Sequence, residues 1–146
     1  MSAATYDRRT VLKAIPTAVG ACALASACGG SAGSQGTVTV VGGVAAVTFA
    51  EFPALETTGG SALIDTSTGA RLVVVRTGTT TATVLSSVCT HDGCAVSYSQ
   101  SANDFQCPCH GSKFALSGQV TQGPATQALK SYVATVVSNA INITVA

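Results

Sequence analysis

The chain has 146 residues, enough for one small domain, and it is rich in Val, Thr, Ala and Gly but has no Trp. Its formal net charge is +1, but three of its seven basic residues lie within the first thirteen positions, so the remainder is close to neutral. Nucleic acid is excluded as an expected partner, because no stripe of basic residues is available to contact a phosphate backbone. The same lack of basic clusters excludes a purely electrostatic attachment to anionic lipid.

Residues 1–27 are typical of an export signal. The pair Arg8-Arg9 precedes an apolar stretch that runs from Val11 to Ala27, and this order is similar to that of twin-arginine signals. The part of the stretch after Lys13 is mostly Ala, contains Pro16 and is shorter than the ~18 apolar residues of a membrane span. Cleavage is therefore expected rather than an uncleaved anchor.

The residues around Cys28 fit two routes of export. Residues 25–27 read Ala-Ser-Ala, an ordinary cleavage site, and the same bond precedes Cys28 and a Gly/Ser-rich tether over 28–36, an arrangement similar to that of lipoproteins. Cys22 is a second candidate for lipidation, but it leaves a very short apolar core. We expect an exported protein of the cell envelope. It is either tethered by lipid at Cys28 on the extracytoplasmic face of the membrane, or free in the periplasm or outside the cell.

Residues 37–146 predict an all-β domain. Short runs of β-branched and other apolar residues alternate with Gly, Ser and Thr, and this pattern favours strands over helices. Two hairpins are expected, one around the turn at 66–69 and one around the turn at 138–140. The expected strands are 37–41, 44–49, 61–65, 71–76, 79–87, 132–137 and 141–145.

Four cysteines and both histidines of the chain lie between residues 89 and 110. They fall in two segments, CTHDGC at 89–94 and CPCHGSKF at 107–114. Each segment pairs one thiol with one imidazole: Cys89 with His91, and Cys107 with His110. Four ligands of mixed sulfur and nitrogen in two loops predict a metal site.

Three other interpretations of these residues remain open from the spacing alone. A structural zinc site would use four ligands but leave Cys94 and Cys109 without a role. Two disulfides would leave the histidines unexplained. A cysteine nucleophile assisted by histidine would explain only one of the two pairs.

The two segments resemble the cluster-binding loops of Rieske iron-sulfur proteins. The resemblance implies an all-β, antiparallel sandwich with an inserted cluster-binding subdomain at about 86–126, and one 2Fe-2S cluster per chain. It also implies that two cysteines ligate one iron and two histidines the other, the arrangement that raises the potential of such centres. The implied ligands are Cys89, Cys107, His91 and His110.

The resemblance implies roles for further residues near the cluster. Cys94 and Cys109 correspond to a disulfide that joins the two loops in the respiratory, high-potential branch, and an exported protein can keep such a bond oxidised. Ser112 matches a serine whose hydroxyl donates to a cluster sulfur and raises the potential. Phe114 stands where the highest-potential members have a tyrosine, so one hydrogen bond is lost, and Pro124 lies in a third loop that covers the cluster.

The implied function is one-electron transfer in the cell envelope. The protein would act as a carrier, or as the iron-sulfur subunit of a quinol-cytochrome c reductase-like or arsenite-oxidase-like complex. Its expected partners are then a quinol-oxidising cytochrome b, a c-type cytochrome or the large subunit of a molybdenum oxidase. The alternative function is a zinc-stabilised structural or binding module without redox activity. An oxygenase component is disfavoured, because the chain is too short for a mononuclear-iron domain.

Overall fold

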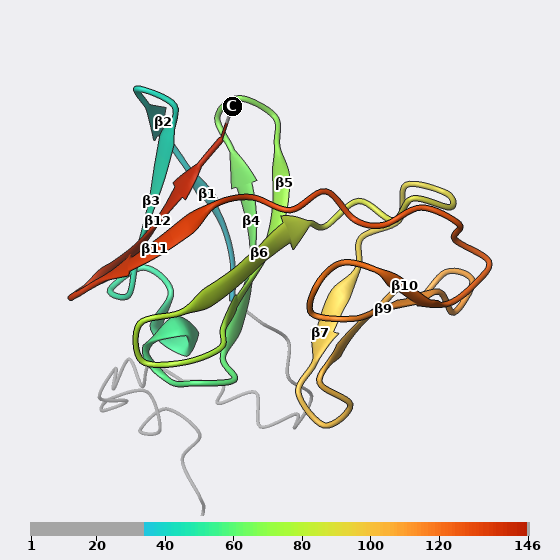
Figure 1. Ribbon diagram of the computed structural model, residues 1–146. Helices are drawn as coiled ribbons and strands as arrows, with labels where there is room; N and C mark the ends of the chain where they lie inside the picture. The colour runs from blue at the N-terminus through green and yellow to red at the C-terminus, as the bar shows by residue number, and fades with distance from the viewer. Residues whose placement is uncertain (1–33, 146) are drawn as a thin grey trace, which may run out of the picture.

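The computed structural model describes residues 34–145, whose regular secondary structure consists of short β-strands and one short 3-10 helix (Figure 1). The expected signal at 1–27, Cys28 and the first part of the tether lie outside the described residues. One short 3-10 helix, η1, spans Pro53–Glu56. The strands are β1 (Ser34–Val38), β2 (Val40–Val41), β3 (Val44–Thr48), β4 (Ser61–Thr66), β5 (Arg71–Arg76), β6 (Ala82–Ser86), β7 (Ser97–Ser99), β8 (Asp104–Gln106), β9 (Lys113–Phe114), β10 (Val120–Gln122), β11 (Ala134–Val137) and β12 (Ala140–Thr144).

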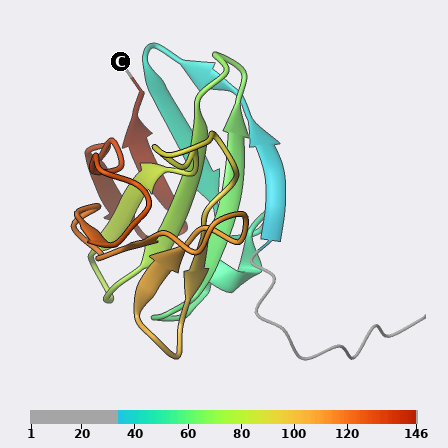
Figure 2. The ribbon, with the colours of Figure 1, turned by 90° about the vertical axis from the view of Figure 1, so that its right-hand side faces the viewer.

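The strands form three four-stranded sheets, in the orders β1-β4-β5-β6, β11-β12-β3-β2 and β10-β9-β8-β7. We call the first the central sheet, the second the outer sheet and the third the insert sheet. Pairing is antiparallel except between β1 and β4, which run parallel. Figure 2 views the molecule from the side of the insert sheet, which lies in front of the central sheet.

The central sheet is covered on both faces, and β5 shows this most clearly. Leu72 and Val74 pack into a core shared with Ile141 of the outer sheet. Val73 and Val75 point the other way, into a second core that includes residues of the insert. A strand buried on both faces needs a continuous apolar run, which is why β5 reads Leu-Val-Val-Val without alternation.

The described strands agree with most of the expected framework. The hairpin β4–β5 and the pair β11–β12 form as predicted, with an antiparallel register in each. The expected strand 37–41 is divided between β1 and β2, and β6 is shorter than the expected 79–87. The strands of the insert sheet and η1 were not predicted, because each is only two to four residues long.

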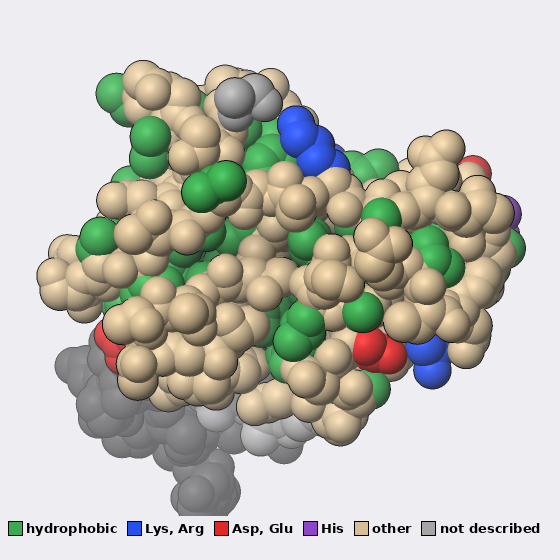
Figure 3. Space-filling model, in the orientation of Figure 1, with side chains coloured by type: hydrophobic (Ala, Val, Ile, Leu, Met, Phe, Trp, Pro, Cys, Tyr) green, Lys and Arg blue, Asp and Glu red, His purple; other side chains and the backbone are tan. Residues whose placement is uncertain are grey.

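The face of the molecule in Figure 3 shows few charged side chains. One cation is buried instead: the guanidinium of Arg76 donates to the carbonyl oxygens of Leu55, Gly78 and Thr79 and stacks over the ring of Phe49. These bonds tie η1 to the turn between β5 and β6. No helix within residues 34–145 is long and apolar enough to cross a membrane.

Candidate metal centre

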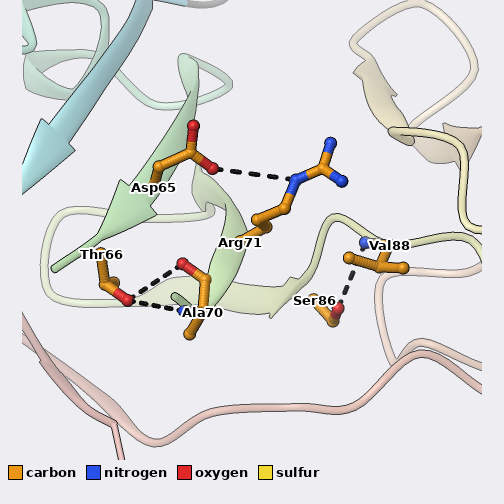
Figure 4. A network of polar contacts seen from close by, with 6 residues as sticks. All are labelled: Asp65, Thr66, Ala70, Arg71, Ser86 and Val88. Atoms are coloured by element: carbon orange, nitrogen blue, oxygen red, sulfur yellow. Dashed lines mark hydrogen bonds and ion pairs between the residues drawn. The ribbon is translucent and has the colours of Figure 1, made fainter. Parts of the chain in front are cut away.

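The first loop, residues 89–94, leaves the end of β6 and closes on itself through backbone hydrogen bonds. At its base the hydroxyl oxygen of Ser86 accepts from the N–H of Val88 at 3.2 Å (Figure 4). Within the loop, the N–H of Cys89 donates to the carbonyl of Cys94 at 2.8 Å, and the N–H of Gly93 donates to the carbonyl of Cys89 at 2.9 Å. Gly93 adopts φ 69°, a conformation that a side chain would strain.

The second loop, residues 107–112, repeats this hydrogen-bond pattern between β8 and β9. The N–H of Cys107 donates to the carbonyl of Ser112 at 2.8 Å, and the N–H of Gly111 donates to the carbonyl of Cys107 at 3.0 Å. Gly111 adopts φ 77°. Both loops are therefore six-residue turns with a cysteine at the first position and a left-handed glycine at the fifth.

A disulfide between Cys94 and Cys109 joins the two loops, with an S–S distance of 2.03 Å and a Cα–Cα distance of 6.5 Å. The pairing that the resemblance implied is thus present. The sulfurs of Cys94, Cys107 and Cys109 all lie within 4.8 Å of one another. Because two of these three sulfurs are bonded to each other, they do not form a ligand set, and the bridge instead packs against the thiol of Cys107.

Cys89 and Cys107 are the free cysteines of the described chain, and both are buried. Burial raises the pKa of the Cys89 thiol, but the backbone N–H groups of His91 and Asp92, the thiol of Cys107 and the hydroxyl of Ser112 outweigh it, so the net pKa is lowered. Burial also raises the pKa of the Cys107 thiol, and the neighbouring Cys89 raises it further. The two thiols thus lie side by side, with Cys89 the first to ionise.

His91 and His110 lie together on the exposed side of the two loops. Their ring centroids are 4.9 Å apart, with the ring planes at 76°. The ring Nδ1 of His110 lies 4.0 Å from a carboxylate oxygen of Asp92. The two loops therefore present two sulfur donors on the buried side and two imidazoles on the solvent side.

A third loop, residues 123–127, is fastened to the other two by hydrogen bonds. The buried hydroxyl of Ser112 accepts from the N–H of Ala125 at 3.0 Å, so its own proton is left to donate. The hydroxyl of Thr90 donates to the carbonyl of Gln127 at 2.7 Å, and the amide of Gln122 donates to the carbonyl of Gly111 at 2.9 Å. No local sequence pattern indicates these contacts, because their partners are 11 to 37 residues apart.

The two remaining residues that the resemblance singled out lie in different surroundings. Pro124 is exposed in the third loop, after a cis peptide bond with Gly123. Phe114 is fully buried in the second core and lies opposite Phe105 in the β8–β9 register. Phe114 is therefore a packing residue as well as the occupant of the tyrosine position.

The known family that fits these loops is identified by a match over residues 50–133 to the model of the Rieske [2Fe-2S] domain, which covers more than half of the chain. The chain belongs to the Rieske [2Fe-2S] domain family. Its cofactor is a 2Fe-2S cluster, and its donor set fits that group. Each of the two loops carries one buried thiol that is free of the disulfide and one imidazole, and the two imidazoles lie side by side, so the donors present are those that a Rieske centre requires.

Curated relatives of this Rieske protein include the cytochrome b6-f complex iron-sulfur subunits of Synechococcus sp. (strain JA-3-3Ab) and Chlorobaculum thiosulfatiphilum. The first is 44% identical over 64 residues, which cover 44% of this chain and 37% of the relative. The second is 43% identical over 61 residues, which cover 42% of this chain and 34% of the relative. The chain thus matches little more than a third of the length of these relatives.

The matches to solved structures cover more of this chain than the matches to the curated relatives do. The plasma membrane Rieske protein PetC3 from Synechocystis PCC 6803 is 33% identical, with a TM-score of 0.55 over 66% of this chain and 94% of that one. The ferredoxin of carbazole 1,9a-dioxygenase from Nocardioides aromaticivorans IC177 shares the fold at 20% identity, with a TM-score of 0.56 over 69% of this chain and 95% of that one. The Rieske fold therefore accounts for almost the whole of each neighbour.

Proposed function

We propose that this Rieske protein transfers single electrons in the cell envelope, with Cys89 and Cys107 holding one iron of its cluster and His91 and His110 the other. The observation that carries the proposal is the arrangement of these four donors, two buried sulfurs behind two exposed imidazoles on a pair of matching loops. When bound, the cluster supplies a one-electron couple. Rieske ligation places its potential above that of all-cysteine plant-type centres.

The surrounding residues hold and shield this centre. The Cys94–Cys109 disulfide fixes the separation of the two loops, and the third loop covers the site through the Ala125 N–H and the Thr90 hydroxyl. Ser112 is placed to donate its proton to sulfur, since its oxygen already accepts from the backbone. Phe114 offers no such donor, so we propose an intermediate-to-high potential, below that of relatives with both hydroxyls.

The exposed imidazoles mark where electrons enter and leave. Backbone and disulfide cover the sulfur side of the site, whereas the side chain of His110 is 48% exposed. A partner that docks over the two rings contacts two of the proposed ligands directly. We therefore propose that redox partners bind this end of the molecule, which lies on the right in Figure 1.

The first 36 residues and the matched relatives support a proposal for the setting of the protein. We propose export by the twin-arginine signal at 1–27, attachment by lipid at Cys28, and the tether at 28–36 as the link to the domain. The matched relatives are subunits of cytochrome b6-f complexes. We accordingly propose a cytochrome as the partner, with the protein acting either as a carrier or as the iron-sulfur subunit of an oxidoreductase complex.

Iron and acid-labile sulfide analysis of the purified protein, followed by a reductive titration in the visible range, tests this function. We expect two irons and two sulfides per chain and a reversible one-electron reduction. The zinc-stabilised module, which the comparisons do not favour, would bind zinc and give a colourless protein with no redox transition. That outcome would overturn the proposal.

A further inference from the structure

The three loops that surround the site carry only one charged side chain, that of Asp92. Apart from the cysteines and histidines, the other residues of 89–94, 107–112 and 123–127 are Thr, Gly, Pro, Ser, Ala and Gln. The side chain of Asp92 is 66% exposed, and its Oδ2 lies 4.0 Å from the Nδ1 of His110. A carboxylate therefore stands at the edge of the surface on which both imidazoles are exposed.

A partner that covers the ring of His110 must also cover this carboxylate. Removing an ionised carboxylate from water is strongly unfavourable unless a cation or several hydrogen-bond donors replace the water. The basic residue that directly follows the second loop, Lys113, is half-buried on β9, where its cross-strand neighbours are Gln106 and Gln122. Among the described residues, the contact recorded for the Asp92 carboxylate is with the Nδ1 of His110 at 4.0 Å, and the loops offer it no lysine or arginine, so the compensating charge has to come from the partner.

We propose that Asp92 determines partner specificity, directing this end of the molecule to a redox protein with a lysine- or arginine-rich docking patch. The inference rests on the proposed electron-transfer function and narrows its partner to the class of basic c-type cytochromes with an exposed haem edge. An apolar quinol pocket in a cytochrome b is disfavoured, because it would bury the carboxylate without a counter-charge. In the favoured complex one electron passes from the reduced protein to the ferric haem, which becomes ferrous, and no bond forms or breaks.

Charge complementarity of this kind acts mainly on the rate of encounter and is screened by salt. The prediction is therefore kinetic. With a basic partner, the second-order rate of electron transfer should fall as ionic strength rises. Removing the charge of Asp92 should slow the reaction at low salt and leave it unchanged at high salt.

The experiment uses the reduced holoprotein in stopped flow against an excess of oxidised, lysine-rich c-type cytochrome. The variants are Asp92→Asn and, as a matched control, Glu56→Gln. The control removes one exposed carboxylate from the end of η1, which lies on the opposite side of the molecule in Figure 1. At low ionic strength we expect Asp92→Asn to be about two- to fivefold slower than the wild type and Glu56→Gln to be close to it. The same cytochrome with acetylated lysines should abolish the difference.

High salt separates this effect from any change of potential, since steering vanishes there and the rates then report driving force alone. Wild-type rates that do not depend on salt, or equal effects of the two variants, would overturn the inference. A third outcome would also overturn the inference: if Asp92→Leu slows the reduction of the protein by a short-chain quinol in detergent, Asp92 belongs to a quinol site. A preparation without iron or visible absorbance contradicts the proposed function itself, whereas an intact centre with salt-independent rates contradicts only the role of Asp92.

Discussion

The two cores on either side of the central sheet are stabilised by different means. The core against the outer sheet consists of buried apolar side chains such as Ile64, Leu72 and Ile141, and it contains no cysteine. The core against the insert sheet contains Phe105 and Phe114 and also the two free cysteines, with the disulfide beside them. The framework is therefore held by apolar burial and its own hydrogen bonds, whereas the insert also depends on a covalent bridge and on its cofactor.

This difference explains why the insert can present its ligands at an exposed end. A small subdomain with strands of two or three residues buries too little apolar area to fold securely by itself. Placing the cysteines inside its core lets the bound cofactor add to its stability. The framework then supplies a rigid base on which the loops are mounted, and changes in the two regions should have separable effects.

The largest effect is expected from Cys107→Ala. Loss of one buried sulfur donor should abolish the cluster, so the visible absorbance of the purified protein should disappear. The framework should remain folded because its core does not include Cys107. Retained β-sheet circular dichroism without colour is the expected result, and a variant that keeps its full iron content would show that Cys107 is not a ligand.

The next largest effect is expected from a substitution that creates a cavity in the core of the framework. Ile141→Ala removes a fully buried side chain and should lower the free energy of unfolding by about 2–5 kcal/mol. Val133→Thr changes a side chain that is 73% exposed and should stay within about 0.5 kcal/mol of the wild type. Denaturant unfolding followed by circular dichroism measures both, and the midpoint potential should be the same in all three proteins. A shift of potential in Ile141→Ala would mean that the two regions are not independent.

Removal of the disulfide should act on the insert and spare the framework. The bridge spans 15 residues, and in the loop-entropy model closing such a loop contributes about 3 kcal/mol. In the double variant Cys94→Ser/Cys109→Ser we expect faster hydrogen exchange in β7–β10 and quicker loss of the cluster in denaturant. Hydrogen exchange in β3 and β12 should be unchanged. Equal acceleration there would show that the insert and the framework are not stabilised independently.

The sequence predicted the framework better than the insert, for physical reasons. Residues 61–65 and 71–76 carry a strong β-branched pattern around a turn, so the hairpin was predictable. The strands of the insert are too short for a period to be recognised, and their arrangement depends on the disulfide and on contacts such as Thr90 with Gln127. The parallel pairing of β1 with β4 joins distant segments and left no local signal.

In the site, too, some features could be predicted from the sequence and others could not. The spacing of cysteines and histidines indicated which side chains belong together, and the glycines at matching positions of the two loops, Gly93 and Gly111, both adopt a left-handed conformation. The sequence did not show that Ser112 accepts from Ala125, or that Asp92 lies beside His110. Those contacts arise between loops, and only the folded chain brings the loops together.

The smallest effects are expected from tuning residues. Ser112→Ala removes a hydroxyl next to Cys89 and should lower the midpoint potential by about 60 mV, the equivalent of ~1.4 kcal/mol for one electron. Ser101→Ala, in the exposed turn between β7 and β8, is the control. Protein-film voltammetry measures both. An unchanged midpoint potential in Ser112→Ala would show that the Ser112 hydroxyl does not affect the potential.

Phe114→Tyr should shift the potential in the opposite direction. The new hydroxyl can donate toward the cluster and raise the midpoint potential by an amount similar to that lost in Ser112→Ala. Because Phe114 is fully buried, a hydroxyl without a partner would cost stability instead. Voltammetry together with an unfolding curve distinguishes the two results: a destabilised protein with no rise in potential would mean that this position does not face the cluster.

The division of the ligands between the two irons is tested most directly by electron paramagnetic resonance of the dithionite-reduced protein. If two sulfurs bind one iron and two imidazoles the other, the average g value lies below that of clusters held by four cysteines, and His110→Ala eliminates the signal. A spectrum typical of four-cysteine ligation, or a protein that holds zinc and gives no signal at all, would contradict the assignment.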